Sequence, residues 1–141
     1  MHHPWRMSAS VAAHTVPIRS GEDVVRVRQE VRRIAIEAGL GLVDQTKIVT
    51  AASELARNTL DYGKGGEAIM EVVQSGARRG VRIVFQDQGP GIADVELALK
   101  DGYTSGKGMG LGLGGARRLC NEFAIESTSG KGTRVTITRW K

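Results

Sequence analysis

Apolar residues recur every three or four positions in two stretches of the first half of the chain, a spacing typical of amphipathic helices. The first stretch, 23–38, predicts a helix that Gly39 ends. The second predicts a helix from Asp44, its N-cap, to Tyr62, with Gly63 closing it. The apolar positions of the two helices are Val24, Val27, Val31, Ile34 and Ala38, then Ile48, Ala52, Leu55 and Thr59.

Shorter apolar or alternating runs in the rest of the chain predict strands. Two of them, 67–75 and 81–86, are joined by a turn-prone segment at 76–80. Two more, 123–128 and 133–140, end the chain. The other predicted elements are an edge strand at 14–18, a short helix at 92–100 and helical character near 111–121. This order predicts an α+β two-layer sandwich, with helices on one face of a mixed, mostly antiparallel sheet.

The chain has 141 residues, enough for one domain with a substantial core. We expect this domain at 15–141, after a disordered leader at 1–14 whose first ten residues do not resemble a secretory signal. No apolar run approaches the roughly 20 residues of a membrane span, so no membrane contact is predicted. A single cysteine, Cys120, excludes an internal disulfide and a multi-cysteine zinc site and favours a reducing, cytoplasmic setting.

The formal net charge is +5, which raises the question of nucleic-acid binding. The basic residues are spread along the chain, and no aromatic residues interleave with them to form a stacking platform. We therefore predict no nucleic-acid partner; an acidic protein or a nucleotide accounts for the same charge. The three histidines all lie near the N-terminus, which argues against a histidine-centred catalytic site.

Three polar features lie at the borders of the predicted core. Glu54 and Asn58 are one helical turn apart and border the buried stripe, where they suit metal binding or hydroxyl activation, or form a solvated helix face. Asp87 has the same parity as the core positions of its strand, and the following "GPG" leaves room for a flat group or makes an ordinary turn. Thr133 shares the parity of the core residues of the last strand, a place that a β-former also suits.

The segment 106–115, "GKGMGLGLGG", is rich in glycine. It contains G-x-G-x-x-G at Gly110, Gly112 and Gly115, but no strand precedes it, so the dinucleotide-binding interpretation fails. The P-loop pattern is also absent. Taken with the three polar features, the segment predicts a nucleotide pocket. A carboxylate at the floor of this pocket would accept a hydrogen bond from an exocyclic amine, and the loop would bind phosphates with its backbone N–H groups.

The segments "ELARN", "DQGPGI", "GKGMGLGL" and "GKGT" resemble, in order and spacing, the boxes of the GHKL ATPase and kinase superfamily. The resemblance extends over about 15–140 and implies the Bergerat-type ATP-binding fold. It also implies that Asn58 ligates Mg²⁺ and that Asp87 accepts the adenine amino group, helped by Thr133 through water. Gly89 and Gly91 would shape the adenine pocket. The implied phosphate-binding residues are Gly108, Met109, Gly110, Leu111 and Gly112.

The stand-alone size most resembles the serine kinases of bacterial sigma-factor partner switching, including those of the stressosome. This implies an ATP- and Mg²⁺-dependent protein serine/threonine kinase with a STAS-domain substrate and a PP2C-type phosphatase as second partner. Glu54 would take the proton of the attacking hydroxyl, and Lys107 would offset phosphate charge or be an ordinary loop lysine. The alternative is an anti-sigma factor that binds a sigma factor directly. The short segment between Gly91 and Gly108 has few groups to seal the site, which implies slow turnover or a nucleotide pocket that closes only on the partner.

Overall fold

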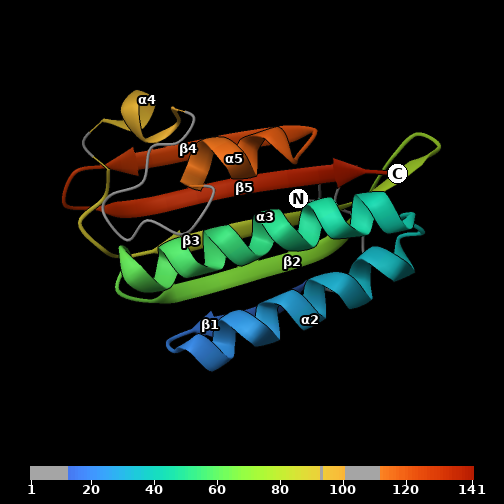
Figure 1. Ribbon diagram of the computed structural model, residues 1–141, viewed down its shortest axis with the longest axis horizontal. Coiled ribbons are helices and arrows are strands. Elements are labelled where there is room, and N and C mark those ends of the chain that lie inside the picture. The colour runs from blue at the N-terminus through green and yellow to red at the C-terminus, as the bar shows by residue number, and fades with distance from the viewer. Residues whose placement is uncertain (1–12, 93, 101–111) are drawn as a thin grey trace, which may run out of the picture.

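The computed structural model describes residues 13–92, 94–100 and 112–141. Its elements follow the predicted order, with helices drawn in front of the sheet in Figure 1. The strands are β1 (His14–Ile18), β2 (Gly66–Ser75), β3 (Arg78–Asp87), β4 (Glu122–Thr128) and β5 (Gly132–Trp140). The helices are α2 (Gly21–Glu37), α3 (Leu42–Asp61), α4 (Val95–Ala98) and α5 (Gly112–Arg118).

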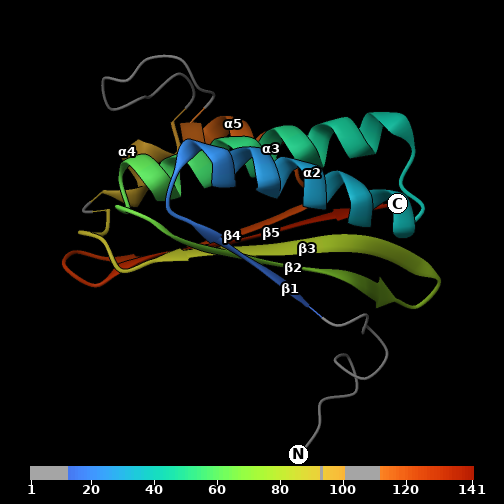
Figure 2. The same cartoon turned by 90° about the horizontal axis from the view of Figure 1, so that it is seen from below.

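The described strands form one sheet in the order β1-β2-β3-β5-β4, and every neighbouring pair is antiparallel. The helices cover one face, so the molecule has two layers (Figure 2). Every residue predicted for the two helical stripes is buried between these layers. The predicted α+β sandwich is confirmed, because one apolar face of the sheet needs one helical layer to cover it.

The predicted N-cap of the second long helix is wrong. The helix begins two residues earlier, after Gly41, and the side chain of Asp44 lies within its first turn. The carboxylate oxygen Oδ1 of Asp44 accepts hydrogen bonds from Nε and Nη2 of Arg139, at 3.0 and 2.7 Å. A charged partner on β5 therefore holds this side chain, in place of the backbone N–H groups of its own helix.

The β2–β3 connection is shorter than predicted. Only Gly76 and Ala77 form the turn, because Arg78 and Arg79 pair with the end of β2. Gly80 lies within β3, where a Cβ atom would come 2.8 Å from the ring of Trp140. The glycine here allows a close strand contact and does not mark the turn.

The helix predicted at 92–100 is shorter in the structure, where only the single turn of α4 is helical. Asp94 caps it by accepting from the N–H of Leu97 at 3.0 Å. Helix α5 packs closely against it, since a Cβ on Gly114 would clash with the carbonyl of Leu99. The helical character predicted near 111–121 is confirmed for α5, which begins at Gly112.

The predicted leader at 1–14 lies mostly outside the described residues, and His14 already belongs to β1. None of the helices within the described ranges combines the length and the apolar character that crossing a bilayer requires.

Candidate functional site

Asp87 is the last residue of β3 and lies on the helix-covered side of the sheet, as its parity predicts. The pairs Phe85–Val135 and Gln86–Arg134 set the register, which places Asp87 beside Thr133 on the neighbouring strand β5. Its Oδ1 accepts a hydrogen bond from the N–H of Gly89, at 2.9 Å. The carboxylate is half-buried, and among the residues that the structure describes the Gly89 N–H is the group that donates to it.

Glycines enclose Asp87 from three directions. A Cβ on Gly63 would lie closer than 3.0 Å to the Asp87 carboxylate, and a Cβ on Gly132 would clash with the Asp87 carbonyl. A Cβ on Gly89 would lie 2.7 Å from the carbonyl oxygen of Gly63. These segments therefore pack directly against Asp87, and the position of its carboxylate depends on the absence of side chains at the three glycines.

Sequence reasoning assigned Gly63 only to the end of the second long helix. The structure places it against Asp87, so it belongs to the candidate site. The signal available in the sequence was the run "GKGG" after that helix, which has more glycines than a helix end needs. The contact between Gly63 and Asp87 joins residues far apart in the sequence, so no local sequence pattern indicates it.

The loop after β3 is fixed to the β4–β5 hairpin. The N–H of Ile92 donates to Oγ of Ser127 at 2.7 Å, and the N–H of Gly130 donates to the carbonyl of Pro90 at 2.6 Å. Gly91 has a φ of 77° and approaches the carbonyl of Thr128 closely, so a side chain at this position would both strain and clash. This geometry explains why position 91 is a glycine, while its predicted role in shaping the adenine pocket stays a prediction.

Glu54 and Asn58 are half-buried and one turn apart near the C-terminal end of α3. The side-chain amide of Asn58 makes no hydrogen bond to any residue that the structure describes, while its backbone carbonyl accepts from the N–H groups of Tyr62 and Gly63. Its amide oxygen is thus available to a cation. Because Gly63 touches Asp87, this end of α3 and the end of β3 meet at one site.

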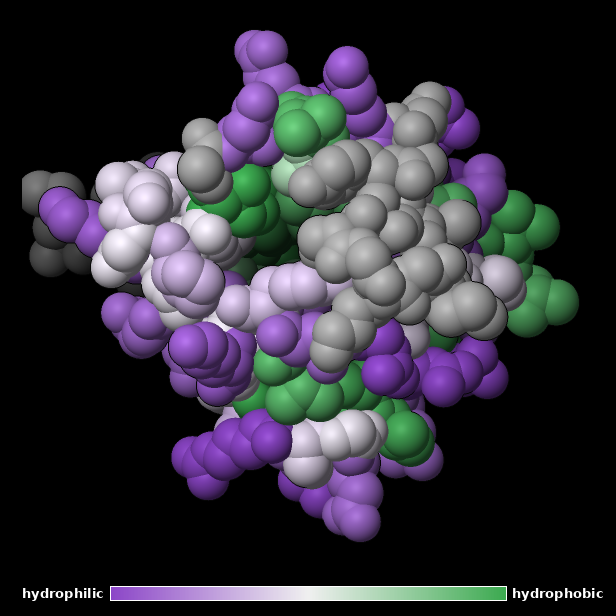
Figure 3. All heavy atoms as spheres, turned by 60° about the vertical axis from the view of Figure 1, so that its left-hand side comes forward, coloured by the Kyte–Doolittle hydropathy of each residue, from purple (hydrophilic) through white to green (hydrophobic). Residues whose placement is uncertain are grey.

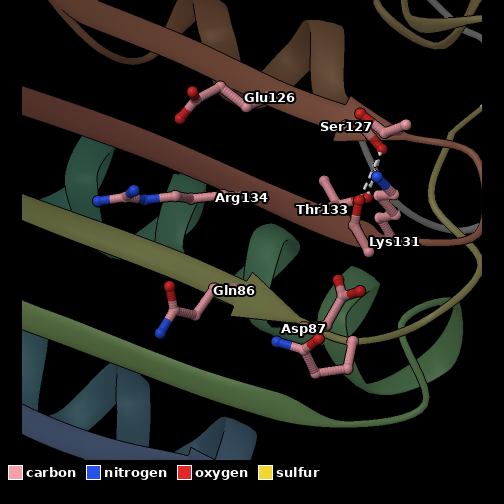
Figure 4. Close-up of a pocket in the computed structure, with 10 residues that line it drawn as sticks. Gln86, Asp87, Glu126, Ser127, Lys131, Thr133 and Arg134 are labelled. Atoms are coloured by element: carbon pink, nitrogen blue, oxygen red, sulfur yellow. Dashed lines mark hydrogen bonds between the residues drawn. The ribbon is translucent and has the colours of Figure 1, made fainter.

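A pocket of about 220 Å³ lies at this end of the sheet. It is lined by Asp87, Ser127, Thr133 and Lys131 (Figure 4). Gln86, Glu126 and Arg134 line it too, and because they alternate with core residues of their strands, the pocket also opens to the uncovered face of the sheet. Viewed from this end, hydrophobic residues lie recessed between hydrophilic ones (Figure 3). The pocket is smaller than the roughly 300–1,000 Å³ of typical ligand pockets. Lys107, Gly108, Met109, Gly110 and Leu111, predicted to bind phosphate, lie outside the described residues.

Comparison with known proteins places this geometry in a family. A family model described as histidine kinase-, DNA gyrase B-, and HSP90-like ATPase matches residues 43–141. The chain belongs to this ATPase family. The predicted membership of the GHKL superfamily is confirmed, and so is the ATP-binding fold that it implies.

Two curated relatives are a serine/threonine-protein kinase and an anti-sigma factor. The chain is 42% identical over 125 residues to the serine/threonine-protein kinase RsbT of Bacillus subtilis, which covers 89% of this chain and 94% of that one. It is 28% identical over 117 residues to an anti-sigma F factor of Clostridium novyi, covering 76% and 82% of the two chains.

A solved structure of the RsbU and RsbW domains of Rv1364c from Mycobacterium tuberculosis has the same fold. Its TM-score is 0.65 at 22% sequence identity, over 93% of this chain and 33% of that chain. This likeness supports the fold of the ATPase domain alone.

The described residues of this ATPase domain fit a purine nucleotide. The Asp87 carboxylate is a pure acceptor, which suits the exocyclic amine of adenine. No cluster of three or more metal-ligating His, Cys, Asp or Glu side chains occurs within the described ranges. A magnesium ion would accordingly be held by Asn58 together with nucleotide oxygens and water, as Mg²⁺ commonly is at phosphate sites.

Proposed function

We propose that this chain is an ATP- and Mg²⁺-dependent protein serine/threonine kinase that phosphorylates a STAS-domain antagonist in a partner-switching module. The observation that carries the proposal is the Asp87 carboxylate, held at the end of β3 by the Gly89 N–H among closely packed glycines. The 42% identity to a named serine/threonine kinase over most of both chains supports the activity.

Adenine binding rests on Asp87 and Thr133. The carboxylate accepts a hydrogen bond from the exocyclic amine, and Thr133 assists through water. Gly89 and Gly91 would shape the adenine pocket through the path of the backbone, since side chains there would clash with Gly63 and Thr128 and displace the loop. Gly108, Met109, Gly110, Leu111 and Gly112 would bind the phosphates, of which Gly112 has a φ of 72° that favours glycine.

Phosphoryl transfer needs a base for the serine hydroxyl and compensation for phosphate charge. Glu54 lies one turn from Asn58 on α3, so a proton acceptor lies next to the proposed metal ligand. Mg²⁺ bound at Asn58 would supply charge stabilisation at the phosphates. Lys107 would add a second positive charge. Transfer is slow in our proposal, because few residues between Gly91 and Gly108 are available to seal the site from water.

The proposed partners are a STAS-domain protein as substrate and a PP2C-type phosphatase that the released kinase activates. The net charge of +5 favours acidic partners. Both proteins would meet the kinase in the cytoplasm, where ATP is abundant.

The test is transfer of labelled γ-phosphate from ATP to a purified STAS-domain protein. We expect label on serine or threonine with the parent, and transfer at least about a hundredfold slower with Glu54→Gln. Equal rates for the two would exclude Glu54 as the base. An absence of transfer, with ATP binding intact, would favour a nucleotide sensor over a kinase.

The second candidate is an anti-sigma factor that binds a sigma factor directly, which the similarity to anti-sigma F factors supports. Co-elution of the chain with purified STAS-domain and sigma proteins separates the two functions. A stable complex with sigma alone would contradict the kinase proposal. A complex with the STAS-domain protein that dissolves when ATP is added would support it.

A further inference from the structure

Ser127 is a half-buried serine of β4 that contacts both segments of the proposed adenine site. Its Oγ accepts a hydrogen bond from the N–H of Ile92 at 2.7 Å, which fixes the loop after Asp87. The same Oγ lies 3.2 Å from the carbonyl oxygen of Gly132 and 2.8 Å from Oγ1 of Thr133 (Figure 4). Ser127 thus joins the loop to the start of β5, although neither segment is its sequence neighbour.

The positions of the hydroxyl hydrogens follow from what each group can donate. A serine or threonine hydroxyl has one hydrogen to give, and a backbone carbonyl can only accept. The Ser127 O–H must therefore donate to Gly132 for that contact to be a hydrogen bond. Thr133 must then donate its own hydrogen to Ser127, and this arrangement satisfies all three contacts of the Ser127 oxygen at once.

The arrangement determines how Thr133 meets a ligand. Since its one hydrogen is directed to Ser127, the hydroxyl presents lone pairs to the pocket and acts as an acceptor. Asp87, beside it on the same face of the sheet, is an acceptor as well. A purine with an amine at position 6 can donate to these groups, directly or through water. A purine with a carbonyl there places a third acceptor against them, which leaves buried polar groups unpaired.

We propose that Ser127 determines the nucleotide specificity of this site: by holding the Thr133 hydroxyl as an acceptor, it makes the pocket select a 6-amino purine over a 6-oxo purine. Ser127 is a positioning residue that acts through Thr133 and makes no ligand contact of its own. The inference rests on the proposed function, in which this site binds ATP.

The experiment compares ATP with inosine triphosphate, which has a carbonyl where ATP has the amine. Calorimetry gives the dissociation constants of both for the parent and for Ser127→Ala. We expect Ser127→Ala to lower the preference for ATP by about three- to tenfold, the equivalent of one hydrogen bond. The matched control is Ser129→Ala, an exposed serine of the same hairpin, which should leave the preference unchanged.

A merely structural role for Ser127 would give a different result. In that case Ser127→Ala would weaken both nucleotides equally, and the unchanged preference would overturn the inference. The Thr133→Val background gives a second test, because there Ser127→Ala should no longer alter the preference. An equal change in both backgrounds would also overturn it. Should Ser127→Ala fail to fold, Ser127→Cys keeps the shape with a weak donor and must lower the preference too.

The outcomes separate this inference from the proposed function. If the parent binds no ATP, the proposed function fails. If the parent binds ATP in preference to inosine triphosphate and Ser127→Ala keeps that preference, only the role of Ser127 is wrong.

Discussion

At the scale of single residues, the proposed nucleotide site rests on the Asp87 carboxylate. Asp87→Asn should weaken ATP binding by about tenfold or more, because an amide presents a donor as well as an acceptor to the adenine amine. Calorimetry measures the change, and circular dichroism checks the fold. Glu22→Gln, an exposed carboxylate of α2, is the control. An unchanged affinity in Asp87→Asn would contradict the pocket assignment.

Gly63 is expected to be as important to the site as Asp87. In Gly63→Ala the new Cβ would overlap the Asp87 carboxylate, so the carboxylate or the end of α3 must move. We expect a loss of ATP affinity and about 1–3 kcal/mol of stability. Gly21→Ala is the matched control, since nothing lies within 4 Å of its added Cβ. Equal urea midpoints and ATP affinities for both variants would refute the role of Gly63.

Cys120 should be unreactive in the folded protein. Burial raises the pKa of this thiol to about 12, against a smaller lowering by Arg139. Below that pH the thiol stays neutral, whereas an exposed cysteine ionises near pH 8.5, and only the thiolate reacts. At pH 8 we expect alkylation by iodoacetamide to be at least about a hundredfold slower in buffer than in urea. Mass spectrometry of both reactions measures this, and equal rates would show an accessible thiol.

At the scale of elements, the Asp44–Arg139 pair joins the start of α3 to β5. Both side chains are mostly buried, with 28% and 16% exposed, and Arg139 also donates to the carbonyl of Leu119. Asp44→Ala should therefore cost about 1–3 kcal/mol in the free energy of unfolding. Arg26→Ala removes a 3.5 Å pair with Asp23 whose arginine side chain is 58% exposed, and should change this free energy by less than about 1 kcal/mol. Urea unfolding measures the free energy of unfolding of both variants. Similar losses in Asp44→Ala and Arg26→Ala would contradict the stabilising role of the Asp44–Arg139 pair.

The elements that the sequence predicts well are those whose structure follows from a pattern of neighbouring residues. The helical stripes and the parity of Asp87 and Thr133 follow from periodicities that continue to the element ends. Asp44 was assigned the wrong role because its partner lies 95 positions away, on β5. Residues 78–80 resemble a turn in composition, yet a strand contact with Trp140 explains the glycine.

The candidate site residues that the sequence predicted also have a local signal, whereas those that it missed depend on long-range contacts. Asp87 is marked by its strand and by the glycines that follow it. Gly63 contacts Asp87, and Ser127 bonds to Ile92, in both cases a residue far away in the sequence. The residues next to Gly63 and Ser127 in the sequence indicate only a helix end and a strand. A single sequence thus indicates the groups that would touch the ligand and misses the groups that hold them.

At the scale of the whole molecule, the residues of the proposed site come together at one end of the two-layer sandwich. Asn58 comes from α3, Asp87 from β3, and Thr133 from β5, so three elements separated in sequence must be in place together. A site of this kind forms only in the folded chain, and ATP binding should raise the unfolding temperature.

The central claim, that this chain phosphorylates a STAS-domain protein, is tested most directly by the intact mass of that protein. Incubated with the chain, Mg²⁺ and ATP, the STAS-domain protein should gain the mass of one phosphoryl group. The gain should be absent with ADP and strongly reduced with Asp87→Asn. An unchanged mass with the parent chain, under conditions where calorimetry shows bound ATP, would contradict the account.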